Sequence, residues 1–121
     1  TGVQTCALPI FTGNVNLSTT SETSLLSNAA SSGLVYKIDT IMISNTNGSA
    51  AANVTVNYHS AAALGGTTYP IASTISVPAN STLLVVDKSN SFYLGENTSI
   101  GVTAGTANYL TATISYESIA S

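Results

Sequence analysis

The alternation of apolar and polar residues with a period of two is the feature that most limits what this chain can fold into. In the run YLTATISY (109–116), Leu110, Ala112 and Ile114 lie on one side and hydroxylated residues fill the other. The run VTVNYH (54–59) repeats the pattern. Successive side chains of a β-strand point to opposite faces, so the pattern predicts antiparallel strands with one buried and one solvent-facing side. No segment shows a convincing helical period.

Turn-forming residues separate these runs at intervals of about 8–12 residues, which is typical of a sandwich or barrel. Asn47-Gly48 predicts a hairpin turn, Gly65-Gly66 a second turn, and Pro78 a turn or strand end. We therefore predict an all-β chain: a single antiparallel β-sandwich, Ig-like or jelly-roll-like, with seven or eight short strands. The predicted strands are 13–19, 34–45, 53–59, 68–77, 81–88, 92–94, 98–104 and 108–117.

Local changes in the pattern add detail. The parity of the apolar residues changes within 35–45, which predicts a β-bulge near Asp39–Thr40. The continuous apolar run in 81–88 predicts a strand buried on both faces, and 20–30 allows a short helical turn. The predicted core comprises Ile38, Ile41, Ile43, Val54, Val56, Ile75, Val77, Leu83, Val85, Leu94, Ile100, Val102, Leu110, Ile114 and Tyr116.

The first ten residues, TGVQTCALPI, differ in composition from the rest of the chain. Their codons can be written as the end of a widely used high-throughput sequencing adapter. We therefore predict that 1–10 is a non-native, adapter-derived segment of an assembled metagenomic sequence, and a genuine N-terminal strand is the alternative. In this division, 11–33 is an N-terminal strand and connection, and 34–121 is the sandwich body, in one domain with it. Cys6, the only cysteine, falls in the first segment and has no functional weight.

Charge is scarce: 6% of the residues are charged, with five acidic residues against two lysines and a net charge of −3. Nucleic-acid-binding domains present basic patches, so we predict no nucleic-acid partner. The shortage of cations disfavours anionic membranes, and no run approaches the ~20 apolar residues that span a bilayer. We therefore predict no membrane partner either.

The solvent-facing positions of the predicted strands carry small neutral side chains: Thr55, Asn57, Ser76, Thr103, Thr111 and Thr113. Covering such a surface desolvates few charges and costs little side-chain entropy. Free monomers normally carry more surface charge and protect their sheet edges. These positions therefore indicate a protein that packs against other proteins, and we predict a homo-oligomer.

No constellation of catalytic type stands out, and we predict no catalytic residue, no metal site, no cofactor and no enzymatic activity. His59 is the only histidine, and we expect it on the surface or at a rim. A hydrolase would need it within hydrogen-bond reach of a serine and a carboxylate. Outward-facing Tyr69 and Tyr109, with Thr111 and Thr113, form the candidate ligand or partner surface. A glycan is the alternative ligand, as in a carbohydrate-binding or adhesin-type β-sandwich module.

The stretches VYKIDTIMISNTNGSAAANVTVNY and ISVPANSTLLVVDKSNSFYLGENTSIGVTAGTANYLTATISYESI carry a resemblance. Residues 34–118 resemble small β-sandwich virion structural proteins of tailed bacteriophages, especially marine ones. The shared features are a strand ending in SN, a V-P-A-x-S turn into an apolar strand, and a last strand ending in SYE. The resemblance implies a non-enzymatic capsid decoration, neck or tail-associated protein whose partners are other virion proteins. Its expected location is the phage particle or, outside a phage, the cell surface or extracellular space.

Overall fold

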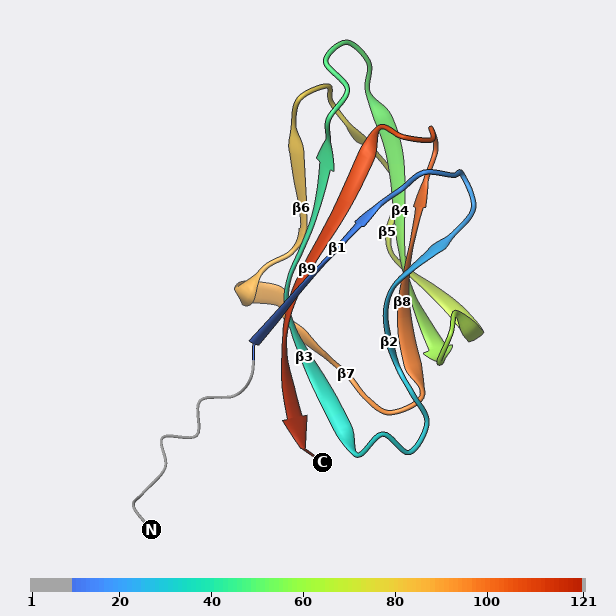
Figure 1. Ribbon diagram of the computed structural model, residues 1–121, viewed down its shortest axis with the longest axis vertical. Coiled ribbons are helices and arrows are strands. Elements are labelled where there is room, and N and C mark those ends of the chain that lie inside the picture. The colour runs from blue at the N-terminus through green and yellow to red at the C-terminus, as the bar shows by residue number, and fades with distance from the viewer. Residues whose placement is uncertain (1–9, 121) are drawn as a thin grey trace.

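Two antiparallel sheets pack against each other in the computed structural model, which describes residues 10–120 (Figure 1). Residues 1–9, which hold most of the predicted adapter-derived segment, lie outside the described residues. The strands are β1 (Ile10–Asn16), β2 (Thr23–Asn28), β3 (Leu34–Asn45), β4 (Ala52–Ala61), β5 (Gly65–Val77), β6 (Thr82–Val86), β7 (Phe92–Leu94), β8 (Thr98–Ala104) and β9 (Leu110–Ala120), with a short 3-10 helix η1 (Lys88–Asn90). The predicted all-β sandwich is confirmed.

The first sheet has the order β1-β9-β3-β6, with β7 pairing to β3, and the second has the order β2-β8-β4-β5. Only the β4–β5 and β6–β7 connections of the described chain stay within one sheet. All others cross from one sheet to the other, which makes the molecule a double-sheet jelly roll with one short additional strand. The predicted Asn47-Gly48 hairpin is wrong, because β3 and β4 lie in different sheets. Instead, the Asn47 side-chain oxygen accepts hydrogen bonds from the Ser49 and Ala50 amides, both at 2.8 Å.

The core lies between the sheets, and most of the predicted core residues are fully buried there. Leu83, Val85 and Tyr116 are partly buried and pack against it. Ile75 was predicted in the core but is 39% exposed. It lies on the edge strand β5, directly after Thr74, whose positive φ of 50° kinks the chain. This kink and the register shifts against β4 break the period of two on which the prediction depended.

Register shifts explain other outcomes of the strand predictions. The β3–β9 register shifts between Ile38 and Thr40, which confirms the predicted bulge. The segment 20–30 contains strand β2 rather than a helical turn, and a shift between Ser24 and Leu26 disturbs its alternation. The expected double burial of 81–88 is also wrong. Strand β6 lies at the edge of the first sheet, and Leu84 is 50% exposed.

Two buried asparagines fasten the connections to the sheets. The Asn45 side chain donates to the carbonyls of Ala50 and Val77, both at 3.0 Å. Asn28 donates to the carbonyls of Leu34 at 2.8 Å and Leu94 at 3.1 Å. Buried polar groups are stable only when they are paired, and these amides satisfy backbone carbonyls at the crossovers.

Candidate functional site

The outer side of the first sheet carries rows of uncharged side chains. The registers of β1, β9, β3 and β6 place Asn14, Thr113, Met42 and Leu84 in one row. Neighbouring rows add further hydroxyl and amide groups. We call this surface the neutral face; it comprises Thr12, Asn14, Asn16, Thr40, Met42, Ser44, Thr82, Leu84, Thr111, Thr113 and Ser115.

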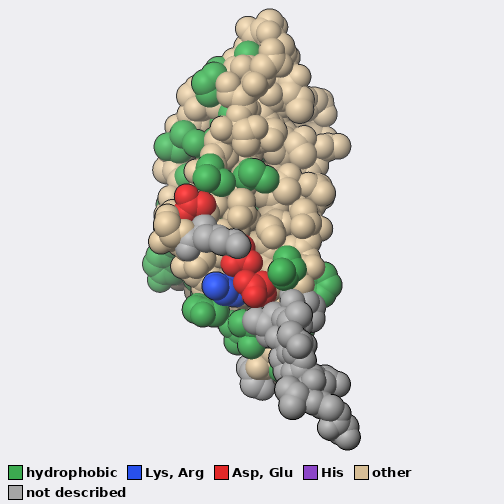
Figure 2. All heavy atoms as spheres, turned by 90° about the vertical axis from the view of Figure 1, so that its left-hand side faces the viewer, with side chains coloured by type: hydrophobic (Ala, Val, Ile, Leu, Met, Phe, Trp, Pro, Cys, Tyr) green, Lys and Arg blue, Asp and Glu red, His purple; other side chains and the backbone are tan. Residues whose placement is uncertain are grey.

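Charged side chains of the first sheet gather at one end instead. Lys37 and Glu117 are register partners on β3 and β9, with Nζ and Oε2 4.0 Å apart. Asp39 lies in the nearby bulge and is buried, at 6% exposure. Figure 2, which views the molecule from the β6 side, shows the coloured acidic and basic side chains in its middle and lower parts. The upper part of that view carries none, so a partner could cover it without desolvating a charge.

Two of the predicted surface residues, Thr111 and Thr113, lie on the neutral face. Both are half-buried. Their hydroxyls donate to the side-chain oxygens of Asn16 at 2.9 Å and Asn14 at 2.8 Å. These bonds join β9 to the edge strand β1 and hold the side chains in fixed positions. Thr111 and Asn16 also line a polar hollow of about 290 Å³ with Thr46, Asn108 and Leu110.

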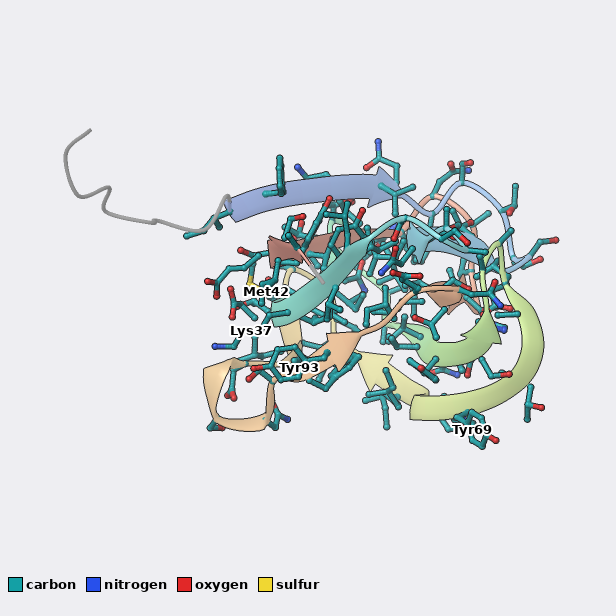
Figure 3. All side chains as sticks on the ribbon, turned by 90° about the horizontal axis from the view of Figure 1, so that it is seen from below. Lys37, Met42, Tyr69 and Tyr93 are labelled. Carbon is teal, nitrogen blue, oxygen red and sulfur yellow. The ribbon has the colours of Figure 1, made fainter. Side chains whose placement is uncertain are left out.

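The two predicted tyrosines have different surroundings. Tyr109 was expected to face outward but is partly buried against the core. Tyr69 is 54% exposed as predicted, and Figure 3 shows its side chain pointing away from the sandwich. The structure adds Tyr93, which is 61% exposed on β7. The sequence offered little signal for Tyr93, because three residues are too few to define an alternation.

Tyr69 borders an apolar groove between the edges of the two sheets. The groove measures about 280 Å³ and is lined by Tyr58, Tyr69, Pro70, Ile71, Val86, Asn90 and Phe92. The centroid of the Tyr58 ring lies 6.4 Å from that of Tyr69 and 6.5 Å from that of Phe92. Asn90 is a polar side chain at this rim, and its oxygen accepts from the Asp87 amide at 2.7 Å. The groove therefore offers aromatic contact and few polar groups.

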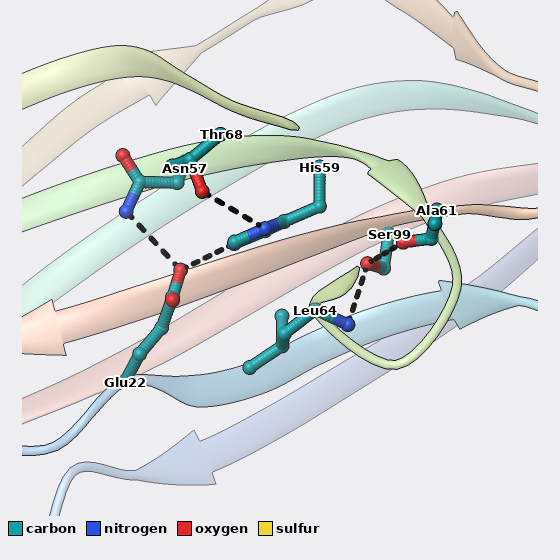
Figure 4. A network of polar contacts seen from close by, with 7 residues as sticks. All are labelled: Glu22, Asn57, His59, Ala61, Leu64, Thr68 and Ser99. Atoms are coloured by element: carbon teal, nitrogen blue, oxygen red, sulfur yellow. Dashed lines mark hydrogen bonds and ion pairs between the residues drawn. The ribbon is translucent and has the colours of Figure 1, made fainter. Parts of the chain in front are cut away.

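The structure corrects the position of His59, which is 2% exposed rather than at the surface. Figure 4 shows the reason: the Glu22 side chain reaches over β8 to the histidine on β4. Glu22 Oε2 lies 2.7 Å from His59 Nε2 and 3.1 Å from Asn57 Nδ2. A Cβ at Gly101 would overlap this carboxylate, so the glycine leaves the space through which Glu22 passes. This pairing is long-range in sequence, and no local pattern could have identified it.

The His59 network resembles a catalytic triad only in part. The Thr68 hydroxyl lies 3.3 Å from His59 Nδ1, and an ionised Glu22 can only accept. The imidazole therefore has a carboxylate beside Nε2 and a hydroxyl beside Nδ1. The 3.3 Å contact lies at the long end of the distances between a nucleophile and its base, and the hydroxyl belongs to a threonine rather than to a serine. Ser99, the register partner of His59, donates to the Ala61 carbonyl at 2.8 Å and accepts from the Leu64 amide at 2.9 Å. The network ties the start of β2 to β4 and β5.

Two further features are missing from the described part of the chain. Within residues 10–120, no group of three or more His, Cys, Asp or Glu side chains is placed to hold a metal ion. None of the helical segments in that range has the length and apolar character needed to cross a membrane.

A scan against protein-family models found no match, and a search of curated proteins found none either. Among solved structures, the chain is similar to one from a study of Bacillus endospore appendages, described as a novel family of disulfide-linked pili, with a TM-score of 0.46 and 17% identity. The similarity covers 98% of this chain and 96% of that chain.

Proposed function

We propose that this protein is a non-enzymatic structural component of a phage virion, in a capsid decoration, neck or tail-associated role. It acts by packing against other virion proteins, copies of itself among them. The observation that carries the proposal is the neutral face, a sheet surface of hydroxyl, amide and apolar side chains with no charged side chain. Desolvating charged groups is a large cost in protein association, and covering the neutral face does not incur it. The resemblance of 34–118 to phage virion proteins supports the same role.

The His59 network supports a structural role over hydrolysis. The imidazole is buried beneath Glu22, and both of its nitrogens face partners within the chain. The network links the β1–β2 connection to β4 and β5, as a structural role requires.

The genes beside this one on its source contig test the proposal. We expect terminase, portal or tail genes to flank it. A neighbourhood of sugar-utilisation or secretion genes would contradict a virion role and favour a different class of protein.

A carbohydrate-binding or adhesin-type module is the second candidate, favoured by one observation. Tyr69 is exposed at the rim of the groove that also holds Tyr58, Phe92 and Asn90. Aromatic faces bind the apolar faces of sugar rings, while amides supply hydrogen bonds. Binding on a glycan array that Tyr69→Ala abolishes, and Tyr93→Ala leaves intact, would favour this candidate. Absence of any glycan signal would favour the structural role.

A further inference from the structure

The edge of the first sheet at β1 differs from the other three edges of the sandwich. β1 pairs with β9 along its whole length without a register shift. The edge strands β2, β5 and β6 each show a shift against their neighbour, and β5 also contains Pro70. Strand β7, which lies beside β6 at the same edge, shows no shift but is only three residues long. Bulges, prolines and charges are the devices that keep a sheet edge from pairing with another chain. β1 has no shift, no proline and no charged residue.

The backbone of β1 presents its free groups in a regular order. The Leu17 amide donates to the Leu110 carbonyl at 2.9 Å, directly after the Asn16–Thr111 pair. In an antiparallel ladder, bonded and non-bonded pairs alternate. Val15, Gly13 and Phe11 therefore direct their amides and carbonyls toward β9. Thr12, Asn14 and Asn16 direct theirs away from the sheet, where an added strand could bind them.

We propose that β1 is an assembly edge that pairs antiparallel with β1 of a second copy of this chain, on a two-fold axis at Asn14. The inference rests on the proposed function only in taking a copy of the protein as the partner. Asn14 then faces Asn14 of the second copy, and Thr12 faces its Asn16. The three outward-facing residues of each strand form a self-complementary set of backbone hydrogen bonds. The two first sheets join into one, and their neutral faces become continuous.

The charge and side-chain order of β1 favour a second copy as the occupant. At the two-fold axis a residue faces its own copy, and like charges directly opposite destabilise a strand pair. Strand β1 has no charged residue, so its pairing with a second β1 meets no charge repulsion. The side chains of Asn14 and Asn16 are already fixed by Thr113 and Thr111, so pairing costs little additional entropy. Closed two-fold dimers are also the commonest homo-oligomers.

Two nearly isosteric variants test the axis. In each, a carboxylate oxygen still accepts the hydrogen bond from the neighbouring threonine, so the fold is kept. Asn14→Asp places two carboxylates face to face in the dimer, whereas the matched control Asn16→Asp places its carboxylate opposite Thr12. Sedimentation equilibrium of the full chain at low salt should give a wild-type dissociation constant on the order of 100 µM, as for a small interface. Asn14→Asp should raise it about tenfold, and Asn16→Asp less than about threefold.

Further readouts decide the outcome. About 0.5 M salt should recover most of the Asn14→Asp loss, because screening weakens like-charge repulsion. Should that variant fold poorly, hydrogen exchange on the wild type replaces it: the amides of Thr12 and Asn14 should be protected at high protein concentration and exchange rapidly on dilution. Equal effects of both variants, or amides that stay unprotected at every concentration, would overturn the proposed edge. A wild type that remains monomeric to about 1 mM would overturn the proposed edge too. That result would leave the virion role itself to be tested by the genes that flank this one on its contig.

Discussion

At the residue scale, the close approach of Glu22 to Gly101 shapes the polar network around the buried His59. The carboxylate passes over the glycine to reach His59 and Asn57. Sequence reasoning identified His59 as the only histidine but placed it at the surface. Its partner lies 37 residues away along the chain, and its burial depends on a side chain from the β1–β2 connection. Burial of this kind depends on tertiary contacts, which alternation does not encode.

Gly101→Ala should destabilise the protein by about 2 kcal/mol. The added methyl group displaces the Glu22 carboxylate, so the histidine and asparagine lose a charged hydrogen-bond partner. Urea unfolding followed by circular dichroism measures the change. Gly95→Ala is the matched control, because nothing lies within 4 Å of a Cβ at that position. A Gly101 variant as stable as the Gly95 variant would show that the network contributes little.

Tyr116 makes stability depend on pH in the alkaline range. Burial, with a smaller contribution from neighbouring Tyr36, raises the pKa of Tyr116 above its ordinary value. The folded state therefore holds this proton more tightly than the unfolded state. The resulting stability is fully present below the ordinary tyrosine pKa and is lost as pH rises through the higher folded-state value.

Tyr116→Phe removes this ionisable group and keeps most of the ring contacts with Phe11 and Tyr36, whose centroids lie 5.5 and 5.0 Å away. The free energy of unfolding of the variant, relative to the wild type, should rise between pH 8 and about 10.5. Chemical unfolding at the two pH values measures it. A difference that stays constant with pH would contradict the assigned cause.

At the scale of elements, regular strands could be predicted and irregular ones could not. Alternation located β3, β4, β8 and β9 to within a few residues, and the parity change located the β3 bulge. Where the register shifts or the strand lies at an edge, buried and exposed side chains no longer alternate with a period of two. This is why β2 was missed and β6 was expected to be buried on both faces.

Strand β5 offers a direct comparison between a correct and an incorrect core prediction. Val77 is fully buried, whereas Ile75 is 39% exposed. Val77→Ala should cost about 2 kcal/mol, because it leaves a cavity in the core, and Ile75→Ala should cost less than about 1 kcal/mol. Thermal and urea unfolding of both variants measure the difference. Equal losses would place Ile75 in the core after all.

At the scale of the whole molecule, the sequence predicted the sandwich but not how its strands connect. Jelly-roll connectivity arises from crossovers between sheets, and turn signals such as Asn47-Gly48 do not distinguish a crossover from a hairpin. The neutral face was foreseen only through Thr111 and Thr113. Its full extent depends on four strands placed side by side by long-range pairing. The charge-free surface is a property of that arrangement, and from it we infer a role in packing.

The most direct test of that role is to find the protein in a particle. Phage particles purified on a density gradient from the sample that yields this gene can be analysed by mass spectrometry. We predict that peptides from residues 11–121 band with the capsid proteins and remain after a salt wash, because the contact surface carries no charge. Peptides found only in the soluble fraction, or removed by the wash, would contradict a virion component that packs through its neutral face.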